Sequence, residues 1–80
     1  MKNFYFTFGQ NHWHKDGFQM HNYWVRVKSD SYENARIKFI EKFTSIYMSA
    51  KDKWAFQYDE EEFDNDSKQF YPLGEFMLIE

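Results

Sequence analysis

Aromatic residues make up 24% of this 80-residue chain, as ten Phe, six Tyr and three Trp. A chain of this length buries only about 60–65% of its unfolded surface, so its folded state is marginally stable. Each aromatic side chain buries on the order of 150–250 Å², and a few of them fill a small core. The composition therefore predicts one domain, residues 1–80, with an aromatic core and a minority of aromatics left for a contact surface.

The composition also argues against several classes of protein. The chain has no Cys, so disulfide bonds and Cys-based zinc sites are excluded. The first residues contain no apolar signal region, and no apolar run approaches the ~20 residues of a membrane span. We expect a cytoplasmic protein that does not enter a membrane.

Three segments alternate apolar and polar side chains in the way β-strands do. A fourth, shorter strand is expected at residues 76–79, after a turn at residues 71–74 that contains Pro72 and Gly74. The alternation places the following side chains on common faces: Phe4, Phe6 and Phe8 in residues 3–8, Tyr23, Val25 and Val27 in residues 21–28, and Trp54, Phe56 and Tyr58 in residues 53–58.

One clear helix is expected from Asp30 or Ser31, either of which is a good N-cap, to about residues 48–50. Residues 59–63 indicate a short helix or turn anchored by Phe63. The element order β-β-α-β-β predicts an α+β domain, with one main helix packed on a small antiparallel sheet of three to four strands. The expected apolar face of the helix consists of Tyr32, Ala35, Phe39, Phe43, Ile46 and Tyr47.

The two parts of the chain differ in charge. Residues 1–50 carry seven Lys and Arg against four acids, whereas residues 51–80 carry three Lys against nine acids. Six of these acids lie between Asp59 and Asp66. Such a run is either a solvated turn or an acidic face that competes for a basic groove on a partner.

All three histidines lie between the first two predicted strands: His12, His14 and His21. Histidine changes charge and binds metals near neutral pH, so the cluster is a candidate site. Three imidazoles would suit zinc with an open fourth position, whereas acid–base catalysis on a phosphate would need a second group and a Gly-rich cradle that the chain lacks. The favoured alternative is a polar network of Gln10, Asn11, His12 and His14 that orders the loop or contacts a ligand.

The second strand carries Trp24 and Arg26 on its expected outward face. Trp24 could stack on a base while Arg26, with Lys28 or Arg36, holds phosphate, which would suit a nucleotide ligand. Duplex nucleic acid is not expected, because the domain is acidic and its basic residues are scattered. A protein partner is the other alternative, with the acids of residues 59–66 as electrostatic guidance and these aromatic anchors: Trp13, Phe18, Tyr23 and Trp24.

The segment Tyr5-Phe6-Thr7-Phe8-Gly9-Gln10-Asn11-His12-Trp13-His14 resembles the start of a group of small, mostly uncharacterised proteins encoded by bacteriophages and prophages. In that group a strand runs into an FGQ-x-H-x-H stretch. A helix with an Ala-Arg pair, a tryptophan strand and an aromatic-Pro-x-Gly ending follow, here at residues 35–36, 53–58 and 71–74. The resemblance implies a phage accessory protein, and small phage proteins of this kind are often inhibitors of bacterial immunity.

These observations predict a non-enzymatic protein of the host cytoplasm that binds and inhibits a host factor stoichiometrically, such as a component of anti-phage defence, in an anti-CRISPR-like manner. Alternatives are a sponge that sequesters a nucleotide signal and a small metal hydrolase built on the three histidines. No cofactor is expected, and a homodimer is favoured by the short chain and exposed aromatics. The expected ligand or partner contacts are Gln10, His12, Trp13, His14, His21, Trp24, Arg26, Asp59, Glu60, Glu61 and Glu62.

Overall fold

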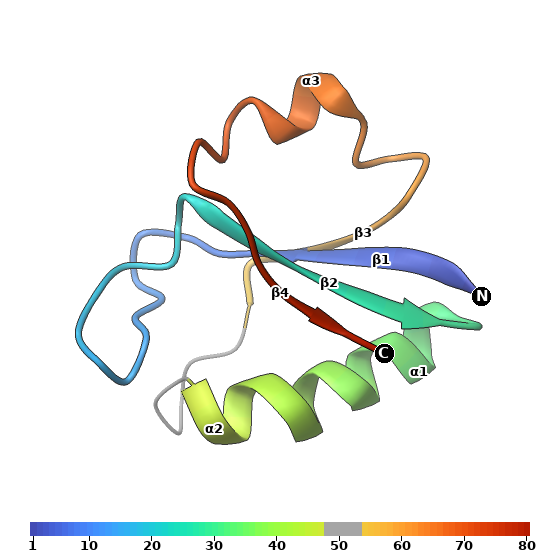
Figure 1. Cartoon of the computed structure of the whole chain (residues 1–80), viewed down its shortest axis with the longest axis horizontal. Coiled ribbons are helices and arrows are strands. Elements are labelled where there is room, and N and C mark those ends of the chain that lie inside the picture. Colours follow the sequence, from blue (N-terminus) through green and yellow to red (C-terminus); the bar gives the residue numbers. More distant parts are fainter. Residues whose placement is uncertain (48–53) are drawn as a thin grey trace.

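The computed structural model describes residues 1–47 and 54–80 (Figure 1). The predicted strands are present, with ends that differ by at most three residues, and the predicted main helix is present as α1, η1 and α2. Residues 60–63 form a turn, one of the two alternatives expected there, and a short helix follows. The elements are β1 (Lys2–Thr7), β2 (Tyr23–Ser29), α1 (Tyr32–Phe39), the π-helical turn η1 (Ile40–Thr44), α2 (Ser45–Tyr47), β3 (Phe56–Asp59), α3 (Asn65–Lys68) and β4 (Gly74–Ile79).

The four strands form one sheet in the order β3-β1-β2-β4. Strand β1 pairs antiparallel with both of its neighbours, so that Phe4 lies opposite Val27 of β2 and Asp59 of β3. Strand β4 runs parallel to β2, with Val27 opposite Ile79. The predicted α+β class with one main helix is confirmed, but the prediction of a wholly antiparallel sheet is wrong at β4.

The parallel pairing of β4 follows from the path of the chain between the two edge strands. A short hairpin cannot join strands that run in the same direction, so the connection must cross the sheet. Residues 60–73, called the crossover from here on, leave β3 at one edge and reach β4 at the other. Figure 1 shows that the crossover with α3 and the helix α1 lie on opposite sides of the sheet.

The main helix begins at Ser31, whose side chain accepts a hydrogen bond from the backbone N–H of Asn34 over 3.1 Å. In its π-helical turn, the hydroxyls of Thr44 and Ser45 donate to the carbonyls four residues earlier, at 2.8 and 2.6 Å. The wider turn rotates the residues that follow it. Ile46 is consequently 49% exposed, which corrects its predicted place on the apolar face. The predicted helix end at residues 48–50 lies outside the described residues.

The main core lies between the sheet and this helix. Phe6 stacks on Phe39 with ring centroids 4.2 Å apart, and Phe39 stacks on Phe43 at 5.1 Å. Trp54 packs edge-on against Phe6 and Phe39 at 5.5 Å. Because Trp54 precedes β3, it turns to the helix side, so the prediction that it shares a face with Tyr58 is wrong. The buried members of this core are Phe4, Phe6, Phe8, Met20, Val25, Val27, Ala35, Phe39, Phe43 and Ile79.

The second face of the sheet is also apolar, and the crossover covers it. Phe63 is 1% exposed and packs on Tyr5, Trp24 and Tyr58 with ring centroids 4.8, 5.4 and 5.6 Å away. The prediction that Phe63 anchors its segment is confirmed. Trp24 was expected on an open outward face, but it lies beneath the crossover, against Phe63 and Tyr71. A sheet with two apolar faces must be covered on both, which is the usual setting of a parallel strand pair.

Candidate functional site

His12 closes the turn at the end of β1. The backbone N–H of Gly9 donates to Nδ1 of His12 over 2.8 Å, and the N–H of His12 donates back to the Gly9 carbonyl over 3.2 Å. The His12 ring also meets Phe8 edge-on, with centroids 6.0 Å apart. Nδ1 of His12 is thus the hydrogen-bond acceptor that closes this turn.

His14 holds the same loop against the rest of the molecule. It is 5% exposed, stacks on Phe18 at 4.4 Å, and packs beside Tyr47 and Phe76 at 5.5 Å. Its Nδ1 accepts a hydrogen bond from the backbone N–H of Asp16 over 3.0 Å, while Nε2 is buried without a hydrogen-bond partner among the described residues. Both histidines therefore order the loop by accepting hydrogen bonds from its backbone.

The three histidines do not assemble a metal centre. No group of three or more His, Cys, Asp or Glu suited to hold a metal ion occurs within residues 1–47 and 54–80. His21 is half-buried, and its Nδ1 has no hydrogen-bond partner in the described part of the chain. Gln10 and Trp13 lie at the loop surface, where Trp13 is 44% exposed and the Gln10 carbonyl accepts a hydrogen bond from Gln19. The loop thus offers an exposed indole and amide to a partner.

Trp24 and Arg26, the residues proposed to hold a nucleotide, already have partners within the fold. Arg26 Nε lies 2.7 Å from Oε1 of Glu75 on β4, and the two side chains are 30% and 34% exposed. The indole of Trp24 is covered by Phe63 and Tyr71. A nucleotide would have to displace Glu75 to reach the guanidinium and the crossover to reach the indole.

The acidic run begins with a turn built by its own carboxylates. Oδ1 of Asp59 accepts hydrogen bonds from the backbone N–H groups of Glu61 and Glu62, at 2.9 and 2.8 Å. Oε1 of Glu62 accepts one in return from the N–H of Asp59 at 3.0 Å. This reciprocal arrangement is a capping box. The turn that it stabilises leads directly into Phe63, which packs over the sheet. Two of the predicted partner-binding acids therefore also have a structural role.

Neighbouring elements hold the turn from outside. The hydroxyl of Tyr32 donates to Glu62, and this bond to a carboxylate raises the pKa of Tyr32 to about 12. The backbone N–H of Asn3 donates to Glu60 over 2.7 Å. Asp64 caps α3 by accepting from the N–H of Ser67, which lowers the pKa of its carboxyl below the ordinary value. The acidic segment is thus fixed to both β1 and α1.

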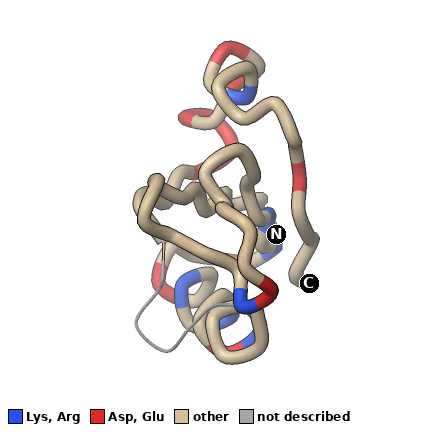
Figure 2. Tube along the Cα trace, turned by 90° about the vertical axis from the view of Figure 1, so that its left-hand side faces the viewer, with Lys and Arg blue, Asp and Glu red and all other residues tan. Residues whose placement is uncertain are grey.

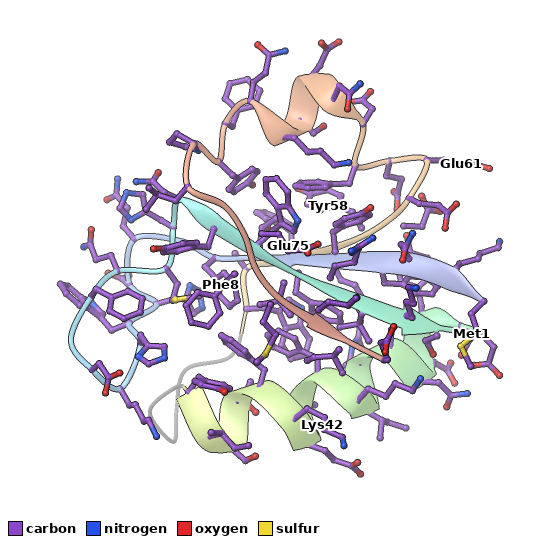
Figure 3. The ribbon with its side chains drawn as sticks, in the orientation of Figure 1. Met1, Phe8, Lys42, Tyr58, Glu61 and Glu75 are labelled. Carbon is purple, nitrogen blue, oxygen red and sulfur yellow. The ribbon has the colours of Figure 1, made fainter. Side chains whose placement is uncertain are left out.

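The carboxylates nevertheless face solvent. Glu60, Glu61, Glu62, Asp64 and Asp66 are all exposed, and Glu61 extends away from the body of the protein in Figure 3. Figure 2 shows acids along the crossover in the upper half of the molecule, and Lys68 is the only lysine or arginine of residues 60–73. Lysines and arginines lie in the lower half and near the N-terminus, and acids lie in the lower half as well. The crossover is therefore a negatively charged surface whose shape is set by hydrogen bonds.

Large apolar side chains lie exposed on and beside the crossover. Phe70 is 78% exposed, Leu73 is 56% exposed, and Phe56 at the adjacent edge strand is 62% exposed. Phe70 and Leu73 were not among the predicted contact residues, and Phe56 was placed only on a common face with Trp54 and Tyr58, because the pattern alone does not distinguish a core aromatic from a surface one. Exposed aromatics beside charges are typical of contact surfaces.

Comparisons with known proteins give no relative: no protein-family model, curated protein or solved structure matches this chain. Among the described residues, no helix has the length and apolar character needed to cross a membrane. The geometry of the crossover is consequently the main basis for a functional assignment.

Proposed function

We propose that this is a phage or prophage accessory protein that binds a host protein through its crossover and inhibits it stoichiometrically. The expected target is a component of anti-phage defence in the host cytoplasm. The partner would present a basic surface to the carboxylates of residues 59–66, and aromatic side chains on and beside the crossover would supply the apolar contact.

The observation that carries the proposal is the combination of fixed geometry and exposure in the acidic turn. Asp59 and Glu62 hold the backbone by reciprocal hydrogen bonds, while the neighbouring carboxylates remain in solvent. A surface that is already ordered loses little conformational entropy on binding. Its negative charge accelerates encounter with a basic partner and disfavours acidic ones.

The two alternative functions have less support. A nucleotide sponge needs a cation that is free to hold phosphate, and Arg26 is paired with Glu75 over 2.7 Å. A metal hydrolase needs converging ligands, and within the described ranges no such group of three residues occurs. Binding without turnover therefore remains the function that the geometry supports best.

The phage origin and the anti-defence role rest on the resemblance of residues 5–14 to small phage proteins. The direct test is expression of the chain in bacterial strains that each carry one defence system, followed by phage plating. We expect plaque formation to be restored in at least one strain. Unchanged plating across a broad panel of defence systems would contradict the anti-defence role.

A capture experiment tests the binding surface. We would compare the natural chain with a variant that combines Glu60→Gln, Glu61→Gln and Asp66→Asn, which removes charge without removing the turn-forming Asp59 and Glu62. The matched control removes three charges elsewhere. Its substitutions are Glu33→Gln, Glu41→Gln and Glu80→Gln.

We expect a host protein to be captured in an equimolar complex by the natural chain and the control. The crossover variant should lose it, and the loss should be mimicked by raising the salt concentration, because the attraction is between exposed charges. Equal capture by both variants would contradict the assignment of the interface to the crossover.

A further inference from the structure

A hollow lined by aromatic rings lies between the crossover and the edge strand β3. Its lining consists of Tyr58, Phe63, Ser67, Phe70 and Tyr71, and its volume is about 260 Å³. Tyr58 and Tyr71 both pack on Phe63 with centroids 5.6 Å away, so the floor is a continuous aromatic surface. In Figure 3, Tyr58 lies between the sheet and the crossover. Phe70 is 78% exposed and forms a wall that stands in solvent.

The surroundings of the hollow are negative. Ser67, which lines it, donates its backbone N–H to Asp64 over 2.9 Å, so a carboxylate lies directly behind the lining. Burial raises the pKa of Tyr58, and the nearby Tyr71 and Glu62 raise it further. Of these causes, the Glu62 carboxylate is the one that would also attract a cation to this position.

Aromatic faces with carboxylates beside them are the chemistry that recognises an organic cation. The negative face of each ring attracts a guanidinium or ammonium group, and the attraction grows as water is excluded. The same aromatic cluster already makes one such contact, since Lys68 Nζ lies 5.2 Å from the Tyr5 ring centroid. Lys68 is directed to Tyr5 and does not line the hollow, so the hollow has room for a cation from outside.

We propose that the hollow receives an arginine side chain of the protein partner. The inference rests on the proposed function, in which the partner presents a basic surface, and it names the contact that gives this surface its specificity. Arginine is favoured over lysine because a planar, weakly hydrated guanidinium stacks on aromatic rings, whereas an ammonium is a strongly hydrated point charge. Phe70 and Tyr71 would flank the guanidinium, and the carboxylates of the crossover would neutralise it.

The test uses the full chain and two synthetic peptides of equal length, oligo-arginine and oligo-lysine, with affinity measured by calorimetry at low salt. The natural chain should bind oligo-arginine more tightly than oligo-lysine. Phe70→Ala should weaken oligo-arginine binding by about 3–5-fold and remove the preference, as expected for an exposed cation–π contact. Because Phe70 is largely in solvent, the variant should fold normally, which circular dichroism would verify.

The control is Ile37→Ala, which removes a 52% exposed apolar side chain from the far side of the molecule. It should leave both affinities unchanged. Equal affinity for the two peptides, or equal weakening by Phe70→Ala and Ile37→Ala, would overturn the arginine assignment. A dimer of the chain that Phe70→Ala dissociates would also overturn it, since the hollow would then be covered by a second copy.

Failure of this inference and failure of the proposed function are distinguishable. If the host protein is captured equally by the natural chain and Phe70→Ala but lost on removal of the crossover charges, the proposed function stands and the hollow has no role. If capture is insensitive to both changes, the crossover is not the interface, and the proposed function fails with the inference.

Discussion

The two faces of the sheet are covered in different ways. On the helix face, Phe39 and Phe43 are fully buried, Phe39 stacks on Phe6 of β1, and the cover is a helix of several turns. On the other face, Phe63 is the one fully buried aromatic of the described crossover residues, and the cover consists of two short capped turns. The comparison indicates that the helix face provides most of the stability, which leaves the crossover free to carry charge and exposed aromatics.

The largest expected effect comes from breaking the helix face. Phe39→Ala would remove a side chain that is stacked on Phe6 at 4.2 Å and on Phe43 at 5.1 Å. We expect a loss of about 4–5 kcal/mol in the free energy of unfolding, measured by urea denaturation, because the close-packed rings cannot collapse into the cavity. A loss below about 2 kcal/mol, the low end of core truncations, would mean that this face is not the main source of stability.

Truncating Phe63, the anchor of the second face, should lower the free energy of unfolding by a smaller amount. Phe63→Ala leaves a cavity near the surface that the crossover and water can fill, so we expect a loss of about 3 kcal/mol in the free energy of unfolding. Chemical shifts in α1 should stay close to those of the natural chain, while those of residues 60–73 should change. A Phe63→Ala variant less stable than Phe39→Ala would reverse the ranking of the two faces.

The histidine loop belongs neither to the helix nor to the crossover, and its contribution to stability should be smaller again. His12→Ala would remove the acceptor for the Gly9 N–H and the contact with Phe8. We expect a loss of about 1 kcal/mol in the free energy of unfolding, the usual net value of one hydrogen bond. Asn11→Ala, at the exposed neighbouring position, is the matched control, and an equal effect of the two would show that the imidazole bond adds nothing.

The smallest expected effect on stability concerns the hydrogen bond between Tyr32 of α1 and Glu62 of the crossover. This bond joins the segments that cover the two faces of the sheet. Tyr32→Phe should cost about 0.5 kcal/mol at neutral pH, since the bond is exposed. The pKa of Tyr32 is raised from 10.0 to about 12, so its stabilising contribution is complete below pH 10 and is lost as the pH rises through about 12.

The raised pKa of Tyr32 can be checked by titrating the tyrosines through their ultraviolet absorbance. The natural chain should show a tyrosine that ionises near pH 12, and the Tyr32→Phe variant should lack that step. Loss of a step near pH 10 in place of the step near pH 12 would mean that Tyr32 does not donate to Glu62 in solution.

The helix face could be predicted from the sequence because its signals are local. Alternation placed Phe4, Phe6 and Phe8 together, and the helical spacing placed Ala35, Phe39 and Phe43 together, as the structure confirms. Ile46 was misplaced because a π-helical turn breaks the 3.6-residue period that the pattern assumes. Periodicity is thus reliable until the backbone itself departs from its regular geometry.

The second face could not be predicted in the same way, because its cover depends on contacts between distant residues. Trp24 was expected on an outward face because no residue adjacent in the sequence covers it. In the structure, Phe63 and Tyr71 lie on its indole. The acidic run was visible, but which carboxylates cap the backbone depends on the turn geometry. The parallel direction of β4 follows from that same crossover, so both errors have one cause.

Amide hydrogen exchange, measured by NMR with and without the oligo-arginine peptide, tests the division between the two faces most directly. In the free protein, the N–H groups of Phe63, Lys68 and Tyr71 in the crossover should exchange through local opening, faster than those in β1 and β2. With peptide, protection should increase at the crossover and stay unchanged in α1. Equal exchange on both faces, or protection gained chiefly in α1, would contradict the account.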